Sequence, residues 1–285
     1  MCDYLYHESF RFPNPPSFTL NEETIAMKIY QQSYTITASD MDITYHITPN
    51  AIMLYFQDCF ARFLTSKHLA AFDLIHDHLI WVITDFDLKF VSDRPLWSTD
   101  IQVQIRFNEI SALRIYVDYW ICDASGAPFA EGSSVWVILD SQTKRPISAK
   151  AMLEAGGIEA TDKGTPCGTH ADTSAKALLK EVEHNVNVTD LDFNGHVCNR
   201  SYLILSLSTL PVEFIQTYSP RYFHIKFARE SFFGDTLTCK ISKGQPMQYW
   251  FDIVNQHGKA ICHIYSEWED KHELLSRDVS EMIPR

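Results

Sequence analysis

One seven-residue pattern, D-x-D-x-x-x-H, occurs twice in this chain and constrains its fold more than any other feature. It reads DMDITYH at residues 40–46 and DLDFNGH at residues 190–196, and each copy runs directly into an apolar stretch. The copies are 150 positions apart, about half of the 285-residue chain. The second copy is chemically richer, because Asn194 stands where the first has Thr44. The pattern predicts a duplicated scaffold with one working site and one structural site.

Other segments repeat in the same order and support the duplication. An apolar–Lys–Phe segment followed by a carboxylate occurs once in each half, and so does a glycine followed ten positions later by a tryptophan. The matched residues are Leu88–Phe90 with Asp93 and Ile225–Phe227 with Glu230, then Gly126 with Trp136 and Gly258 with Trp268. Repeats in one order are hard to explain by chance, so we expect a tandem fold.

The composition fits one large globular domain or two of ordinary size. Hydrophobic residues make up 46% of the chain, which is enough to bury a core in each half. A formal net charge of −12 argues against a general binder of nucleic acids or anionic membranes. The longest apolar runs, such as 79–83, are too short to cross a bilayer, and the first residues lack the apolar core of a secretion signal.

The cysteines indicate a reducing compartment. Seven of them are scattered along the chain, and no two form a C-x-x-C pair. An odd number of widely separated cysteines predicts reduced thiols rather than a disulfide framework or a zinc site. We therefore expect a cytoplasmic protein with no metal site.

Capping residues, with an apolar period in the first half, predict one helix in each half. Thr48 and Pro49 are typical of an N-cap followed by a proline at the first helical position. In the second half, Asn199 is the expected N-cap of a helix that reaches about Leu210 and stops at Pro211. The first helix should be deeply buried, because apolar residues recur at steps of three and four. These residues are Ile52, Tyr55, Phe56, Cys59, Phe60 and Phe63.

Strand-like segments surround each predicted helix. Those of the first half are 33–37, 79–84, 86–91, 101–107, 113–122 and 133–139. Those of the second half are 182–188, 223–228, 236–242, 248–255 and 260–268. A very apolar helix needs apolar surface on most sides, and a curved sheet wrapped around it provides that surface. Pairing between the halves would merge the two sheets and leave fewer open edges.

Residues 155–177 separate the two halves. This stretch holds four of the ten glycines, with several Thr and Asp residues and no hydrophobic period. Such a composition predicts an exposed linker. The expected units are therefore 1–154 and 178–285.

The second copy of the motif contains a candidate active site. If the segment is extended, Asp192, Asn194 and His196 alternate along it and point the same way. The following helix would add free N–H groups near Val197 and Cys198. This set suits the hydrolysis of an ester or thioester, because one group can accept a proton from water while N–H donors hold the oxyanion, each worth about 3 kcal/mol. The alternative is that these residues are only caps and turn formers.

Glu230 is a second candidate. It lies in the segment KFARES at 226–231, at the end of a predicted apolar strand. The simpler interpretation is a surface ion pair with Arg229 or Lys226. The residues alone leave both interpretations open.

The second half also carries a specific family motif. DLDFNGHVCN at 190–199, followed by Tyr202 and later by the segment RES at 229–231, resembles the plant and bacterial acyl-acyl-carrier-protein thioesterases. Their motif has the form D-L-D-x-N-x-H-V-N-N-x-x-Y, with a later R-E-C segment, and the resemblance covers nearly the whole chain. It implies an α+β tandem (double) hotdog fold, in which each unit is a long central helix wrapped by a curved antiparallel sheet. It also implies hydrolysis of the thioester between a fatty acyl chain and the phosphopantetheine arm of acyl carrier protein.

The resemblance assigns roles to particular residues. It implies catalytic roles for Asp192, Asn194, His196 and Glu230. It also implies that the first unit, 1–154, shapes the acyl-chain pocket without catalysing, while 178–285 catalyses. The helix residues that we expect to contact the acyl chain are Ile52, Phe56 and Phe60, although plain core packing would give the same pattern.

The chain departs from the family motif at Ser231, Cys198, Leu205 and Ser208, of which the last two concern helix packing and not chemistry. Ser231 stands where plant relatives carry Cys, so a cysteine nucleophile at that position is excluded. Ser231 stays a candidate for substrate contact and an alternative to water as the nucleophile. Cys198 replaces the first Asn after H-V, and its place in the capping segment favours a packing role.

We predict general-base hydrolysis. Glu230 would activate water, while Asn194 and a helix-terminal N–H bind the thioester carbonyl. His196 would position the water or the substrate, and Asp192 would fix the geometry. The acidic carrier protein also needs basic residues on the enzyme, which predicts salt-dependent activity. Candidates are Arg200, Arg221, Lys226, Arg229, Arg62 and Lys67.

Several alternatives remain at this stage. An acyl-coenzyme A thioesterase of the same fold would use the same chemistry, while a hydratase or a non-catalytic acyl-binding protein would have less use for the full polar set. A metal hydrolase lacks a second His at ligand spacing, and the chain has no G-x-S-x-G, P-loop or G-x-G-x-x-G motif. We expect no cofactor. Either a monomer or a homodimer is compatible, because two paired halves already reproduce the usual hotdog dimer.

Overall fold

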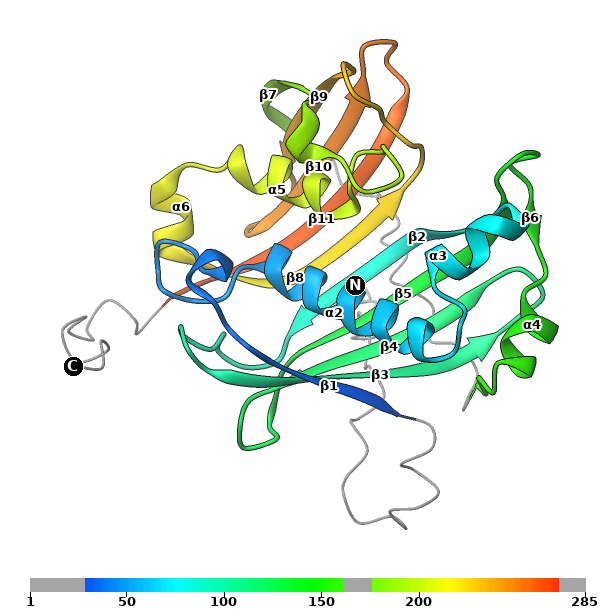
Figure 1. Cartoon of the computed structure of the whole chain (residues 1–285). Coiled ribbons are helices and arrows are strands. Elements are labelled where there is room, and N and C mark those ends of the chain that lie inside the picture. The colour runs from blue at the N-terminus through cyan, green and yellow to red at the C-terminus, as the bar shows by residue number, and fades with distance from the viewer. Residues whose placement is uncertain (1–28, 161–175, 272–285) are drawn as a thin grey trace, which may run out of the picture.

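A single curved antiparallel sheet organises the molecule. The computed structural model describes residues 29–160 and 176–271. Within these ranges eleven strands form one sheet in the order β1-β3-β4-β5-β2-β8-β11-β10-β9-β7, with β6 paired to β5. The two long helices, α2 and α5, contact each other and lie on the same face of the sheet (Figure 1).

The first half contributes the strands from β1 to β2 in that order, together with β6. Its strands are β1 Tyr30–Thr35, β2 Leu79–Phe90, β3 Asp100–Ile110, β4 Ile115–Cys122, β5 Pro128–Asp140 and β6 Pro146–Ile147. Its helices are α2 Pro49–Ser66, α3 Ala71–Leu74 and α4 Lys150–Ala155, with the 3₁₀ turns η1 Ala38–Asp40 and η2 Ile75–Asp77.

The second half repeats this plan with fewer elements. Its strands are β7 Ala177–Asn185, β8 Tyr218–Phe227, β9 Thr236–Lys243, β10 Gln248–Asn255 and β11 Ala260–Asp270. Its helices are α5 Asn199–Ser208 and α6 Val212–Thr217, with the 3₁₀ turn η3 Val188–Asp190. None of the helices within the described ranges is long and apolar enough to span a membrane.

Helix α2 forms the core of the first half, as its periodicity predicts. Its start is confirmed, because the hydroxyl of Thr48 accepts the N–H of Ala51 and Pro49 is the first helical residue. Phe56 is fully buried, and its ring stacks on Tyr119 with the centroids 4.9 Å apart. Gly132 permits this approach, because a Cβ there would lie 2.9 Å from the Phe56 ring. Each such buried apolar side chain contributes about 1.5–3 kcal/mol to stability.

The two halves are joined by antiparallel pairing of β2 with β8. The register runs from Asp85 opposite Lys226 to Lys89 opposite Tyr222. Alternation along these strands places Phe86, Leu88, Phe223 and Ile225 in the core. The expectation that the halves merge into one sheet is therefore confirmed.

Several expected element boundaries are wrong. The strands predicted at 79–84 and 86–91 are one strand, β2, with a register shift between Ile83 and Asp85. The N-cap of α5 is Cys198, and Asn199 is its first helical residue. After Pro211 the chain forms the short helix α6, which was not predicted, and β8 begins at Tyr218 instead of near Phe223. Most of the expected linker, 155–177, lies outside the described residues, and the proposed unit boundaries stay predictions.

Candidate active site

The second motif folds as a tight turn and not as the extended segment that the alternation suggested. The N–H of Gly195 donates to the carbonyl of Asp192 at 3.0 Å, and the N–H of Asp192 donates to the carbonyl of His196 at 2.8 Å. Gly195 has φ = 77°, in the left-handed region that favours glycine. The period-two geometry is therefore wrong, because the glycine and the hydrogen bonds of Asp192 reverse the chain.

The carboxylate of Asp192 holds this turn together. Its Oδ1 accepts the backbone N–H groups of Asn194 at 2.8 Å and His196 at 3.2 Å. Asn194 itself is exposed at the tip of the turn. Asp192 thus fixes the backbone position of His196, and its role in a reaction stays a prediction.

A second segment brings Glu230 to His196. The N–H of Val197 donates to the carbonyl of Ser231 at 2.9 Å, and His196 forms an isolated bridge with Phe232. As a result Nδ1 of His196 lies 3.7 Å from Oε1 of Glu230, with both side chains partly exposed. The ring of His196 also packs edge-on against Phe232, with the centroids 5.1 Å apart.

The expectation that the N–H groups of Val197 and Cys198 are free to bind an oxyanion is wrong. Both N–H groups already have acceptors, the carbonyl of Ser231 for Val197 and the carbonyl of Asp190 for Cys198, the latter at 2.8 Å. These hydrogen bonds link the motif to its neighbouring segments. They form before the helix starts, which sequence spacing alone does not reveal.

The structure brings Lys144 to the site, which no sequence pattern predicts. This residue comes from the β5–β6 turn of the first half, and its Nζ lies 3.8 Å from Oε2 of Glu230. The first half reaches the motif a second time through Phe72 of α3, whose ring stacks on Phe193 with the centroids 5.3 Å apart. The candidate site therefore lies where α3 and β6 of one half face the end of β8 of the other (Figure 1).

Ser231 is directed away from the site. Its side chain is fully buried, at 0% exposure, and its hydroxyl lies close to the phenol of Tyr202. Its neighbour Glu230 has a side chain that is 35% exposed.

In the first copy of the motif, Asp42 forms an ion pair with Arg94. Nη1 of Arg94 lies 2.8 Å from Oδ2 of Asp42 and also donates to the carbonyl of Ile47 at 2.7 Å. Burial alone would raise the pKa of Asp42, but Arg94 and hydrogen bonds from Thr44 hold that pKa below its usual value. Burial, and then the Arg94 guanidinium, lower the pKa of His46.

Arg94, and not Asp93, occupies the place of Glu230 in the first copy. The N–H of Ile47 donates to the carbonyl of Pro95 just as that of Val197 donates to Ser231. The residue before Pro95 thus corresponds to the residue before Ser231. The equal spacing that paired Asp93 with Glu230 is misleading, because the first half has one additional residue in this loop.

The helix residues proposed to contact the acyl chain are all in the packed core. Ile52 and Phe56 are fully buried and Phe60 is 2% exposed. The ring of Phe60 stacks on Trp136 with the centroids 4.6 Å apart. Their contribution to an acyl pocket stays a prediction.

Several of the proposed basic landing residues have local partners. Arg62 pairs with Asp58 at 2.6 Å, Arg221 pairs with Glu269, and Arg229 donates to the carbonyl of Ala260 at 2.8 Å. Lys226 is exposed on the outer face of β8. A landing surface for an acidic partner therefore stays a prediction.

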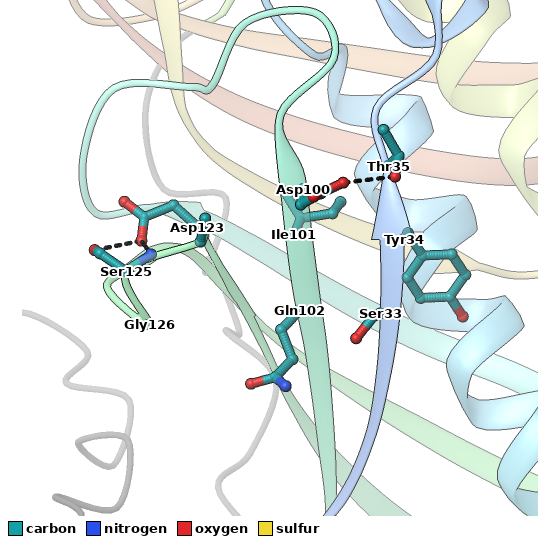
Figure 2. A pocket seen from close by; sticks show the side chains of 10 residues that line it. Ser33, Tyr34, Thr35, Asp100, Ile101, Gln102, Asp123, Ser125 and Gly126 are labelled. Carbon is teal, nitrogen blue, oxygen red and sulfur yellow. Dashed lines mark hydrogen bonds between the residues drawn. The ribbon is translucent and has the colours of Figure 1, made fainter.

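A depression of about 740 Å³ lies elsewhere on the molecule (Figure 2). It is lined by β1, by the start of β3 and by the β4–β5 turn, including Asp123 and Ser125. The hydrogen bond from Thr35 to Asp100, 2.6 Å long, lies in its wall. None of the predicted site residues lines it. Among the described residues, no three His, Cys, Asp or Glu side chains are placed to hold a metal ion.

Two helix-in-sheet units merged into one sheet, with an imidazole beside a carboxylate in the second unit, define a double hotdog protein with a hydrolase-like site. Comparison with known proteins identifies the family. The model of the acyl-ACP thioesterase N-terminal domain matches residues 27–153, and that of the acyl-ACP thioesterase C-terminal domain matches residues 173–270. The chain belongs to the acyl-ACP thioesterase family.

Solved structures share the fold at low sequence identity. An acyl-ACP thioesterase from Bacteroides thetaiotaomicron has a TM-score of 0.74 at 18% identity, over 88% of this chain and 100% of that chain. A putative oleoyl thioesterase from Lactobacillus plantarum has a TM-score of 0.76 at 18% identity, over 85% of this chain and 96% of that chain. A curated relative, the chloroplastic acyl-[acyl-carrier-protein] hydrolase FATB1 of Cuphea viscosissima, is 22% identical over 208 residues. That match covers 68% of this chain and about half, 49%, of the relative.

Proposed function

We propose that this protein hydrolyses the thioester of fatty acyl-acyl carrier protein and releases a free fatty acid. The pairing of His196 with Glu230 at 3.7 Å, within the family's motif, is the observation that carries the proposal. Family membership and the double hotdog fold support the same activity. An acyl-coenzyme A thioesterase of the same fold is the alternative, since only the carrier would differ.

The proposed reaction is attack of water on the thioester carbonyl. Glu230 accepts a proton from the water while the oxygen of the water bonds to the carbonyl carbon of the thioester. The carbon–sulfur bond then breaks, and the carrier's sulfur leaves as a thiol by taking the proton that Glu230 accepted, which restores the Glu230 carboxylate. The 3.7 Å separation between His196 and Glu230 exceeds a hydrogen bond, so both groups can bind a water beside them. His196 orients this water, and Asp192 holds His196 in place through its backbone N–H.

The proposed oxyanion donors change because Val197 and Cys198 are engaged. The first N–H groups of an α-helix have no acceptor within the helix, which favours those of Asn199 and Arg200 at the start of α5. The exposed carboxamide of Asn194 is the second donor. Removing one such donor typically lowers the rate about 100- to 1,000-fold.

Replacement of Glu230 tests the proposal directly. Turnover should be measured on a panel of acyl-acyl carrier proteins and acyl-coenzyme A thioesters. Glu230→Gln should lower kcat at least about 100-fold, because it removes the base without changing the shape of the side chain. Glu154→Gln, at an exposed glutamate of α4 that pairs with Lys150 at 3.9 Å, is the matched control and should be fully active. Near-normal turnover of a folded Glu230→Gln protein would exclude Glu230 as the base.

We also propose that α2 helps to set the acyl-chain length. Ile52, Phe56 and Phe60 lie in the core of the unit that would hold the chain. Smaller side chains, as in Phe56→Leu and Phe60→Leu, should shift the preference towards longer chains, at a cost of about 1–3 kcal/mol in stability. Unchanged chain-length profiles in both folded variants would restrict α2 to packing.

A monomer should suffice for this activity. The β2–β8 pairing joins two hotdog units within one chain, as a hotdog dimer does between two chains. Light scattering at assay concentration, combined with turnover, tests this. Activity confined to a dimeric fraction would contradict it.

A further inference from the structure

The first half contributes more than a scaffold to the candidate site. Its contacts reach both catalytic segments, through Phe72 on Phe193 next to Asp192, and through Lys144 on Glu230. The second contact reaches the proposed base itself. A lysine next to a catalytic carboxylate can control where that carboxylate points.

The turn that carries Lys144 is held in one shape. Oδ1 of Asp140 accepts the N–H groups of Gln142 and Thr143 at 3.0 and 2.7 Å. The N–H of Lys144 donates to the carbonyl of Asp140 at 2.8 Å, and the N–H of Ser141 donates to the carbonyl of His78 at 2.7 Å. The turn is therefore tied both to itself and to the start of β2.

Lys144 has an unfavourable backbone conformation for its residue type. Its φ is 57°, in the left-handed region that costs a residue with a Cβ about 1–2 kcal/mol. Glycine or asparagine would adopt this conformation at lower cost. Strained residues that persist often serve function, so the choice of lysine here points to its side chain.

Lys144 and His196 contact different oxygens of Glu230. Nζ of Lys144 lies 3.8 Å from Oε2, and Nδ1 of His196 lies 3.7 Å from Oε1. The carboxylate thus lies between two nitrogen groups, one from each half. The phosphate of a phosphopantetheine arm is separated from the thioester by the length of the arm. A lysine beside Glu230 therefore meets the reacting end of the substrate and not the phosphate.

We infer that Lys144 is a positioning residue supplied by the first half, which holds the carboxylate of Glu230 in the orientation that activates water. This inference rests on the proposed function. It predicts that loss of the lysine side chain lowers kcat and leaves KM nearly unchanged, because the lysine acts through Glu230 and not on the carrier.

Four variants test this role, each measured beside the wild-type protein on acyl-acyl carrier protein and on a short acyl-coenzyme A. Lys144→Met should lower kcat about five-fold on both substrates, the size expected of a partly exposed ion pair. Lys144→Arg should restore most of the activity. Lys144→Gly should lower kcat equally while keeping or raising the melting temperature, since glycine relieves the backbone. Lys150→Met, at an exposed lysine of α4 that also pairs with a glutamate, should have no effect.

The outcomes separate this role from its alternatives. Wild-type kcat in Lys144→Met and Lys144→Gly would overturn it. A rise of KM on the carrier-linked substrate alone would also overturn it and would assign Lys144 to carrier binding. A wild-type protein without turnover on any thioester would refute the proposed function and this role together, whereas wild-type turnover with unaffected variants would refute only the role of Lys144.

Discussion

At the residue scale, the neighbouring side chains of Glu230 and Ser231 point in opposite directions, one towards solvent and one into the core. The chain reverses direction after β8, and the hydrogen bond from Val197 to the carbonyl of Ser231 fixes this reversal. It leaves Glu230 partly exposed beside His196 and turns Ser231 fully into the protein. Burial raises the pKa of Tyr202, whose phenol lies against the Ser231 hydroxyl. A hydroxyl in this apolar setting has no access to a thioester, which supports water as the nucleophile.

Replacement of Ser231 checks that assignment. Ser231→Ala should keep kcat within about three-fold of the wild-type value, because no step of the proposed reaction uses the hydroxyl. It should keep or raise the free energy of unfolding, by about 1 kcal/mol or less, because the buried hydroxyl has no hydrogen-bond partner among the described residues to lose. The measurement is steady-state hydrolysis of acyl-acyl carrier protein, with urea unfolding as the control for stability. A loss of activity above 100-fold in a folded variant would instead indicate a serine nucleophile.

The residues of the site differ in how far the sequence could predict them. His196 and Glu230 are predictable because the motif and the later acidic segment recur together in a known family. Lys144 is not, because it is a lysine in an ordinary polar turn and reaches the site only through the pairing of β2 with β8. The prediction of free N–H groups at Val197 and Cys198 was wrong for a related reason. Their acceptors lie in segments whose positions depend on the tertiary fold.

At the element scale, the two motif turns share one backbone geometry but carry different side chains. In both, an aspartate carboxylate accepts the N–H of the residue two positions on, Thr44 in the first copy and Asn194 in the second. Tyr45 and Gly195 both have positive φ, at 63° and 77°. The predicted helices and most strands are correct because their apolar periods match their burial. The short helices α3, α4 and α6 escaped prediction, since four to six residues are too few to show a period.

The ion pair of the first copy makes a prediction about stability. Arg94→Met should lower the free energy of unfolding by about 3 kcal/mol at neutral pH, because it leaves the partly buried carboxylate of Asp42 without its cation. The double variant Asp42→Asn with Arg94→Met should lose clearly less unfolding free energy than the single variant Arg94→Met. The measurement is a double-mutant cycle by urea unfolding. Equal losses in the single and double variants would show that the two residues are not coupled.

The same pair should depend on pH in a defined direction. The folded protein holds the pKa of Asp42 below its unfolded value, so the pair stabilises the fold above the unfolded pKa near 4. This contribution is lost as the pH falls through the lowered pKa of the folded state. The difference in stability between the wild-type protein and Arg94→Met should therefore shrink in acid. A difference that stays constant between about pH 7 and pH 3 would contradict this electrostatic origin.

At the scale of the whole molecule, a polar cluster on the outer face ties the halves together. Asp87 of β2 is 1% exposed, and its Oδ1 accepts the phenol of Tyr222 at 2.6 Å. Nδ1 of His224 lies 2.9 Å from the same oxygen. Both partners belong to β8, so the cluster lies directly on the junction between the units. The candidate site needs this junction, because Lys144 and Phe72 reach Glu230 and Phe193 only while the halves are joined.

Removal of Asp87 should therefore affect stability and activity together. Asp87→Leu should lower the free energy of unfolding by about 3–5 kcal/mol, because Tyr222 and His224 lose a shared buried acceptor. It should also lower kcat, because a loosened junction displaces Lys144 from Glu230. Asp85→Asn, at a less buried position of the same strand, is the matched control and should change stability by less than about 1 kcal/mol. Urea unfolding and turnover measure both effects. If Asp87→Leu lost stability but kept full kcat while folded, the site would not depend on contacts across the junction, and the second unit would catalyse without help from the first.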